Sequence, residues 1–326
     1  MMNFIKKYGR LVISANSHIY HLSRFVKYSN WAGDIEKKEN RNYHAVKVYH
    51  SLEKSLSFRE QRKESGWGNA REMLRIWEAA ARNDNIGYHD QAGVKVLSDF
   101  IKSKENTSAD SDDENYDDVH LAAEHIPTDV GVKTVTEQDL KKGMLSSPED
   151  FFLSRYSLRD FKPDSIPEEE LLRAIELVKK TPSVCNRQEW KIYHTSDRSV
   201  IKEALKYQSG NKGFGHLVPN LIIVSIDLRA FIQGQEHYQQ WIDGGMLSMS
   251  IVYSLHSLGI GSCCLNWSQK PKIEKQLRKS LNIENHNSVI MMIACGYPNN
   301  TNAVCVSPRV PTSYIHETLQ LRRKKK

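Results

Sequence analysis

The stretch that decides the fold is SRYSLRDF at residues 154–161, which is followed after one helical segment by TPSVCNRQEW at residues 181–190. The first part offers two guanidinium groups and a hydroxyl within five residues, and guanidinium groups match planar anionic oxygens. The second part supplies an amide side chain, which can read the donor and acceptor edge of a heterocycle. The residues alone therefore predict a site for an anionic, planar ligand.

The segment between these two parts predicts a helix over residues 167–180. It opens with a proline and three glutamates and closes with two lysines, which suits the positive N-terminal and negative C-terminal ends of a helix. Three other stretches predict strands, and the last two are apolar enough to be buried on both faces. They are Trp190 to Thr195, Leu221 to Ile226 and Val289 to Ala294.

A second helix is predicted from His237 to Leu258. It is apolar around most of its circumference and contains Gly244-Gly245. Because such a helix must be covered on every side, we expect it in the centre of the domain or at a dimer interface.

Residues 1 to about 103 are predicted to be mainly helical, since apolar residues such as Met73, Ile76 and Trp77 recur at helical spacing. Residues 1–31 contain five basic residues, several aromatic residues and no Asp or Glu. A basic, aromatic, amphipathic segment can lie on a membrane surface, and it can equally form a helix packed on the main domain. The C-terminal run Arg322 to Lys326 has two similar interpretations: weak contact with an anionic surface, or a solvated tail that aids solubility.

Residues 105–118 are rich in acidic residues and contain no basic residue. Sequence of this kind cannot bury enough apolar surface to offset the cost of ordering it, so we expect a surface loop or linker. Its carboxylates lack the glycine and the final glutamate spacing of a calcium loop, so no metal site is predicted.

The composition narrows the class of protein. The 326 residues are 39% hydrophobic with no uninterrupted apolar run of about 20 residues, so a membrane-spanning helix is not expected. The cysteines are odd in number, all lie in the second half and form no Cys-x-x-Cys pair, which argues against a disulfide framework and for a reducing compartment. No convincing signal peptide is present. We expect a cytoplasmic protein whose partners do not include nucleic acid.

The pattern Arg-x-Ser-x-Arg-x-Phe, followed after one helix by Pro-Ser-x-x-Asn-x-Gln-x-Trp, resembles the opening of the FMN-dependent nitroreductase family. The resemblance covers roughly residues 150–316 and ends with Pro308-Arg309. It implies an α+β, nitroreductase-like fold with a central, mainly antiparallel sheet flanked by helices. We accordingly expect a helical N-terminal extension at residues 1–104, an acidic linker and connecting segment at 105–149, and an FMN-binding domain with a basic C-terminal tail at 150–326.

The resemblance also implies roles for single residues. Arg155 and Ser157 would hold the ribityl phosphate of FMN, and Tyr156 lies between them in the cofactor-binding segment. Arg159 would reach the N1/O2 side of the isoalloxazine, where a positive charge stabilises the reduced flavin. Arg309 would complete the phosphate clamp from far along the chain.

Pro182, Ser183 and Asn186 match the family segment that covers the flavin from the partner subunit, so the resemblance implies a homodimer. Asn211 aligns with an amide that faces the flavin ring edge, and Asn266 lies where the backbone of the family approaches N5. Glu189 departs from the proline that is usual before the tryptophan. No dedicated catalytic acid or base and no metal ligand is predicted.

The implied function is that of an FMN-dependent oxidoreductase with a ping-pong cycle. NAD(P)H would deliver hydride to flavin N5, and a small organic acceptor of nitro, quinone or enone type would then take its place. The segment from His50 to Gly68 resembles an extension found on nitroreductase-like proteins associated with surface-polysaccharide gene sets, which implies a link to polysaccharide biosynthesis.

Two alternatives remain open at this point. In the first, the reduced flavin reacts with oxygen or with a bound organic substrate. In the second, the protein is a flavin-binding or cofactor-free scaffold that docks a membrane or an assembly partner.

Overall fold

The computed structural model describes residues 2–59, 65–105, 117–124, 126, 130–232 and 234–321, without the side chains of residues 2–8, 10, 105 and 117. Three further parts of the sequence analysis lie outside the described residues. They are the side chains of Lys6, Lys7 and Arg10, most of the acid-rich segment (residues 106–116) and the basic run 322–326. The main elements are α1 (Met2–Tyr28), α2 (Lys38–Ser57), α3 (Trp67–Arg82), α4 (Tyr88–Glu105), α5 (Asp117–Ala123), α6 (Glu137–Lys141), α7 (Pro148–Leu153), α8 (Glu168–Val178), β1 (Trp190–Thr195), α9 (Arg198–Lys206), β2 (Asn220–Asp227), α10 (Gln239–Ser257), β3 (Gly261–Asn266), α11 (Pro271–Leu281) and β4 (Asn287–Gly296). Short 3-10 turns include η1 (Val184–Asn186), η3 (Leu228–Ala230) and η4 (Gly234–Tyr238).

The four strands form one sheet in the order β1-β2-β4-β3, and every neighbouring pair is antiparallel. The two central strands, β2 and β4, are buried along almost their whole length, as their continuous apolar sequences predict. The expected α+β class with an antiparallel sheet is confirmed, and the predicted strands lie where the sequence placed them.

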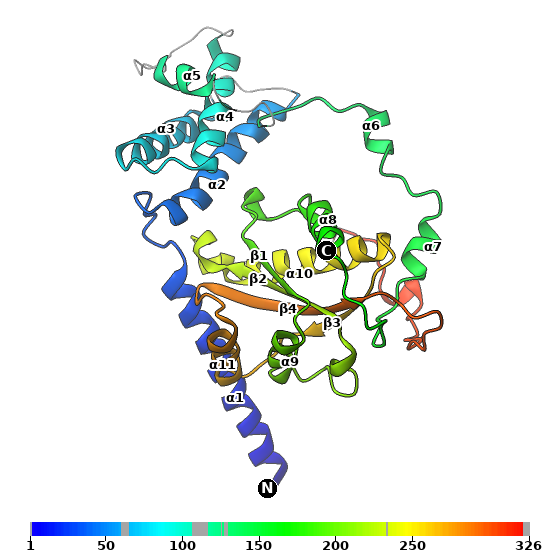
Figure 1. Ribbon diagram of the computed structural model, residues 1–326. Helices are drawn as coiled ribbons and strands as arrows, with labels where there is room; N and C mark the ends of the chain where they lie inside the picture. The colour runs from blue at the N-terminus through cyan, green and yellow to red at the C-terminus, as the bar shows by residue number, and fades with distance from the viewer. Residues whose placement is uncertain are drawn as a thin grey trace, which may run out of the picture.

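Helices cover both faces of this sheet (Figure 1). Ile222 and Val224 of β2 point to one face and pack under α8 and α10, whereas Leu221 and Ile223 point to the other face and pack against α9 and α11. This alternation follows from the two-residue period of a strand. The sheet is therefore the middle layer of a three-layer domain.

Helices α2, α3, α4 and α5 bury a separate apolar core. At one end of this core the guanidinium of Arg41 donates to both carboxylate oxygens of Asp90, at 3.0 and 3.2 Å, and both side chains are fully buried. The helical segment before residue 104 has two parts, because α1 packs on the sheet domain instead of this bundle. Phe25 of α1 stacks on Phe231, and Arg24 pairs with Glu274 of α11 at 2.9 Å.

The described part of the connecting segment after α5 contains the short helix α6, and α7 begins at its end. In Figure 1, α6 and α7 follow the outside of the molecule on the way from the helical bundle to the sheet domain. Neither helix buries a residue. The stretch from α6 to α7 therefore joins the bundle to the sheet domain without a buried core of its own.

Helix α10 is covered by the sheet and by parts of neighbouring helices, and one part of its surface is exposed. Leu247, Ile251 and Leu255 are buried against the sheet, whereas Trp241, Ile242, Met246 and Met249 are between 37% and 52% exposed. The expected cover on every side is therefore met only in part within the chain, by the sheet and by contacts with α8 and α7. Among the described residues, no helix combines the length and the apolar character needed to cross a bilayer.

Candidate functional site

The segment that contains Arg155, Ser157 and Arg159 runs beside the edge strand β3. Ser157 forms a parallel bridge with Ser262, and the Leu158 amide donates to the Ser262 carbonyl oxygen at 2.9 Å. A Cβ atom at Gly261 would lie 2.4 Å from Cδ2 of Leu158, so a larger residue there would require the Leu158 side chain to move. With Leu158 buried, its neighbours Ser157 and Arg159 project from the opposite side of the extended segment.

These residues line a cavity of about 320 Å³ together with a segment from the end of the chain. The structure thus brings together five of the predicted cofactor residues: Arg155, Tyr156, Ser157, Arg159 and Arg309. The remaining lining residues are Phe152, Leu153, Cys305, Val306, Ser307 and Pro308, and no carboxylate is among them. The three guanidinium groups create a strongly positive cavity.

The arginine side chains have donor capacity to spare. Arg159 donates to the Cys305 sulfur at 3.6 Å, and Arg309 donates to the carbonyl oxygen of Ser307. Arg155 forms no ion pair within the described part of the chain. Since a guanidinium carries five N–H donors, the cavity can bind a multiply charged oxyanion through several charge-assisted hydrogen bonds.

The second predicted segment forms the tight turn η1 just before β1. Cys185, Asn186 and Gln188 have positive φ angles of 51°, 55° and 51°, a left-handed conformation that side chains other than glycine rarely adopt. The Ser183 hydroxyl accepts a hydrogen bond from the Gln188 amide at 2.9 Å. Unfavourable backbone angles at three of four consecutive residues require strong support from the surroundings.

Arg187 supplies part of that support. Its side chain is 1% exposed, donates to the Ala230 carbonyl oxygen at 2.7 Å and pairs with Glu236 at 2.5 Å. No local pattern marks this role, because Glu236 lies 49 residues further along the chain, in the 3-10 turn η4.

Two buried acidic residues complete the support. Glu189 and Asp243 are both fully buried, and Asp243 accepts hydrogen bonds from the Val184 amide at 3.1 Å and from Gln239 at 2.8 Å. Burial, together with the hydrogen bond and the charge of Asp243, raises the pKa of Glu189 from 4.5 to about 9. A pKa of about 9 keeps the buried Glu189 carboxyl protonated and uncharged at neutral pH, so its position near Asp243 does not place two negative charges together.

Changing Glu189 to glutamine is expected to flatten the pH dependence of stability. Because the folded protein binds the Glu189 proton more tightly than the unfolded chain, this contribution to stability is complete below about pH 4.5 and is lost as the pH rises through about 9. The slope is at most about 1.4 kcal/mol per pH unit. Urea unfolding at pH values across this range should show a steeper decline for the wild type than for Glu189→Gln, with the exposed Glu176→Gln as control. Parallel profiles for all three proteins would contradict the assignment.

The two predicted halves of the site lie at opposite edges of the sheet. Ser157 and its neighbours flank β3, whereas Pro182, Ser183 and Asn186 lie at the start of β1. With the order β1-β2-β4-β3, the two edge strands are separated by three strand spacings, or about 14 Å. The second segment therefore does not contribute to the arginine-lined cavity of its own chain.

Asn211 and Asn266 are connected through a residue that the sequence analysis did not identify. The Asn211 amide donates to the carbonyl oxygens of Leu205 at 2.9 Å and Gln208 at 2.5 Å, so it organises its own loop. Gln208 in turn donates to the carbonyl oxygen of Asn266 at 2.9 Å. Neither asparagine lines the arginine-lined cavity.

Comparison with known proteins finds relatives of the part of the chain that contains the arginine segment. Residues 153–212, which include the arginine segment and the strained turn, match the Nitroreductase family model. This part of the chain is therefore similar to the nitroreductase family. An Archaeoglobus fulgidus protein provisionally named NADH dehydrogenase/NAD(P)H nitroreductase is 28% identical to it over 151 residues, which cover 45% of this chain and 83% of that protein.

Solved nitroreductase structures resemble about half of this chain, at lower sequence identity. An FMN-dependent nitroreductase from Clostridium difficile R20291 aligns with a TM-score of 0.45 and 19% identity, covering 52% of this chain and 98% of that one. NfrA2 of B. megaterium aligns with a TM-score of 0.46 and 17% identity, covering 55% of this chain and 77% of that one.

Proposed function

We propose that the protein is an FMN-dependent oxidoreductase in which the arginine-lined cavity holds the phosphate end of the cofactor. The observation that carries this proposal is the convergence of Arg155, Arg159 and Arg309 on a cavity without a lining carboxylate. Such a donor set fits a phosphate dianion, and the extended backbone beside β3 leaves the Ser157 hydroxyl free to add a further donor. The residues present therefore fit FMN.

The protein side chains bind and orient the cofactor. Arg155 and Arg309 would hold the phosphate from two distant parts of the chain, and Arg159 would place a positive charge beside the ring system, where it favours the reduced form. When bound, FMN supplies hydride acceptance and donation at N5. No side chain in the cavity has to act as an acid or a base.

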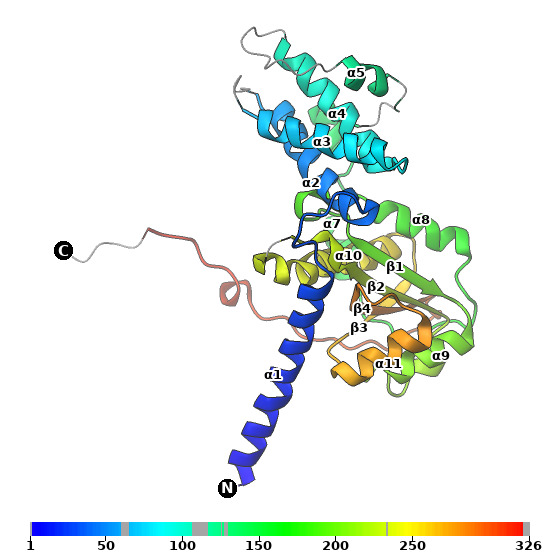
Figure 2. The ribbon, with the colours of Figure 1, turned by 90° about the vertical axis from the view of Figure 1, so that its left-hand side faces the viewer.

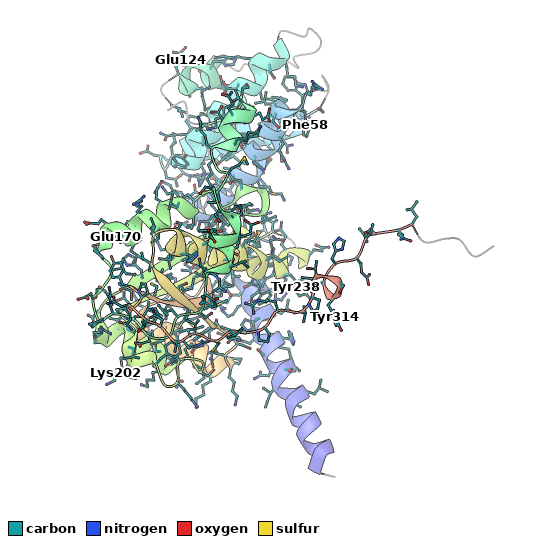
Figure 3. All side chains as sticks on the ribbon, turned by 90° about the vertical axis from the view of Figure 1, so that its right-hand side faces the viewer. Phe58, Glu124, Glu170, Lys202, Tyr238 and Tyr314 are labelled. Atoms are coloured by element: carbon teal, nitrogen blue, oxygen red, sulfur yellow. The ribbon has the colours of Figure 1, made fainter. Side chains whose placement is uncertain are left out.

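We infer that the working form is a homodimer, because each chain carries the two halves of the site at opposite edges of its sheet. A two-fold partner could place its turn at residues 182–186 over the flavin of the first chain. The exposed apolar side of α10 offers a surface for such a contact. The chain end from Cys305 to Leu321 is also exposed and contains one short 3-10 turn at Thr312–Tyr314. Figure 3 shows Tyr314 of this segment on the same side of the molecule as Tyr238 before α10.

NAD(P)H is the proposed reductant, in agreement with the name of the Archaeoglobus fulgidus relative. The acceptor would be a small nitro, quinone or enone compound, or an intermediate of polysaccharide biosynthesis if the segment from His50 to Gly68 has the significance that its sequence suggests. Residues 60–64 of that segment lie outside the described residues.

The absorption spectrum of the purified protein tests this function first. We expect a flavin spectrum at one flavin per chain, release of FMN and not FAD on denaturation, and bleaching of the flavin by NADH or NADPH under anaerobic conditions. A colourless protein that cannot be reconstituted with FMN would refute the proposal and favour a scaffold role. If the protein contains FMN but neither NADH nor NADPH reduces it, the proposed cofactor stands and the proposed reductant is refuted.

A further inference from the structure

We propose that α1 docks the protein on an anionic membrane surface, with the helix lying flat in the lipid interface. This inference concerns a part of the chain that the proposed flavin site does not use. It rests on three observations: an exposed apolar stripe on α1, the position of this stripe opposite the body of the protein, and the positive charge of the N-terminal segment.

The apolar residues of the stripe recur along α1 at a spacing of 11 residues, which keeps them on one side of the helix. Leu11, Ile19, Leu22 and Val26 are between 50% and 66% exposed, and Ala15 continues the series. At about 100° per residue these positions fall within an arc of about 80°. An 11-residue period nearly matches the natural winding of an α-helix, so the stripe runs almost straight along it.

The opposite side of α1 holds the helix to the protein. Arg24 and Phe25 are buried, and Tyr20, His21 and Tyr28 are partly buried. On the same angular scale these residues centre roughly 150° away from the stripe. In Figure 2 the first half of α1 extends beyond α11 and the sheet domain. The apolar stripe can therefore lie on a flat surface without interference from the body.

The connection of α1 to the body is rigid. Arg24 donates to Glu274 at 2.9 Å and to the carbonyl oxygens of Asn285 and Asn287 at 2.8 and 3.0 Å. Arg278 donates to the same Glu274 oxygen at 2.7 Å. A surface that binds α1 thus fixes the orientation of the whole sheet domain.

The charge of the N-terminal segment, which has five basic and no acidic residues over positions 1–31, favours an anionic lipid surface over a second copy of the helix. The chain has no Asp or Glu before Asp34. The adjacent helix α11 carries exposed lysines at positions 272, 275 and 279, and Lys275 lies 5.3 Å from the ring of Tyr20, on the side of α1 that faces the body. Two such helices side by side would offer no acidic partners for their basic residues, as a paired coiled coil requires. A leaflet with anionic headgroups provides those charges and also receives the apolar stripe.

Flotation of the full-length protein with lipid vesicles tests the proposal. We expect binding to phosphatidylcholine vesicles that contain phosphatidylglycerol, weak binding to phosphatidylcholine alone, and loss of binding at high salt. The variant Leu11→Gln with Ile19→Gln and Leu22→Gln should bind anionic vesicles at least about tenfold more weakly. The matched control changes Ser14 and Asn16 of the same helix to glutamine and should bind as the wild type does, with unchanged far-UV circular dichroism in both variants.

Two results would overturn the proposal. One is a wild-type protein that does not float with anionic vesicles. The other is a stripe variant that floats as well as the wild type while sedimentation velocity shows a lower association state, since the stripe would then be covered by a second copy. Flavin content is measured in parallel, so that a failed membrane proposal leaves the test of the flavin site untouched.

Discussion

Replacing Arg155 and Arg309 with alanine in one protein is expected to abolish flavin retention during purification while leaving the chain folded. Both residues line the arginine-lined cavity, and neither is buried in a core. Each replacement removes charge-assisted hydrogen bonds worth about 1.5 to 3 kcal/mol, so the double change should weaken FMN binding by two to four orders of magnitude. Fluorescence titration with FMN measures the affinity, and circular dichroism reports the fold.

The control for this experiment removes the same charge elsewhere. Arg173 and Lys191 are exposed and lie outside the cavity, so Arg173→Ala with Lys191→Ala should bind FMN as the wild type does. Reduced FMN affinity in both double variants would indicate a general effect of net charge. Stoichiometric flavin in the Arg155→Ala, Arg309→Ala protein would refute the assignment of the phosphate site.

Changing Asp90 to alanine is expected to unfold the helical bundle of α2 to α5 or to destabilise it severely. Asp90 accepts hydrogen bonds from Arg41 and from the Gly87 amide at 2.8 Å, and its removal would leave the fully buried Arg41 without its counter-charge. Breaking one partner of a buried ion pair costs about 3 to 5 kcal/mol. Thermal unfolding by circular dichroism, with limited proteolysis between α2 and α4, measures the effect.

Two comparisons make this prediction specific. Asp99→Ala breaks a partly exposed pair with Lys95 on the same helix and should cost less than about 1 kcal/mol. Arg41→Met combined with Asp90→Leu removes both buried charges and should recover much of the stability, because no unpaired charge remains. Flavin content should stay unchanged in every variant, since none of the residues that line the arginine-lined cavity belongs to this bundle. An Asp90→Ala protein as stable as Asp99→Ala would contradict the role of this ion pair.

Most of the sheet domain could be predicted from local sequence. Continuous apolar runs at residues 221–226 and 289–294 predicted buried strands, and the proline, the glutamates and the lysines predicted the limits of α8. The first part of the motif also included Arg155, Tyr156, Ser157 and Arg159, which line the arginine-lined cavity. Such features are readable because strand burial, helix ends and short binding segments depend on residues that are close in the chain.

The supports of the strained turn could not be predicted in this way. Glu189 stands where a proline was expected, but its neighbour Asp243 lies in a helix whose sequence is mostly apolar. Arg187 pairs with Glu236, which lies in a turn far along the chain. Gln208 connects the loop of Asn211 to the end of β3 for a similar reason. These contacts join residues far apart in sequence, and no periodic pattern marks them.

The sequence by itself determined the class of the fold, the strands and helices of the second half, and the residue types suited to a phosphate. Those properties follow from side-chain chemistry and local spacing. Only the tertiary structure decided that Arg309 meets Arg155 beside β3, that the turn at residues 182–186 lies at the opposite edge, and that the apolar stripe of α1 faces away from the body. The physical reason is that the strand order and the packing of helices on the sheet set which distant segments meet, whereas local spacing sets only which residues share a face.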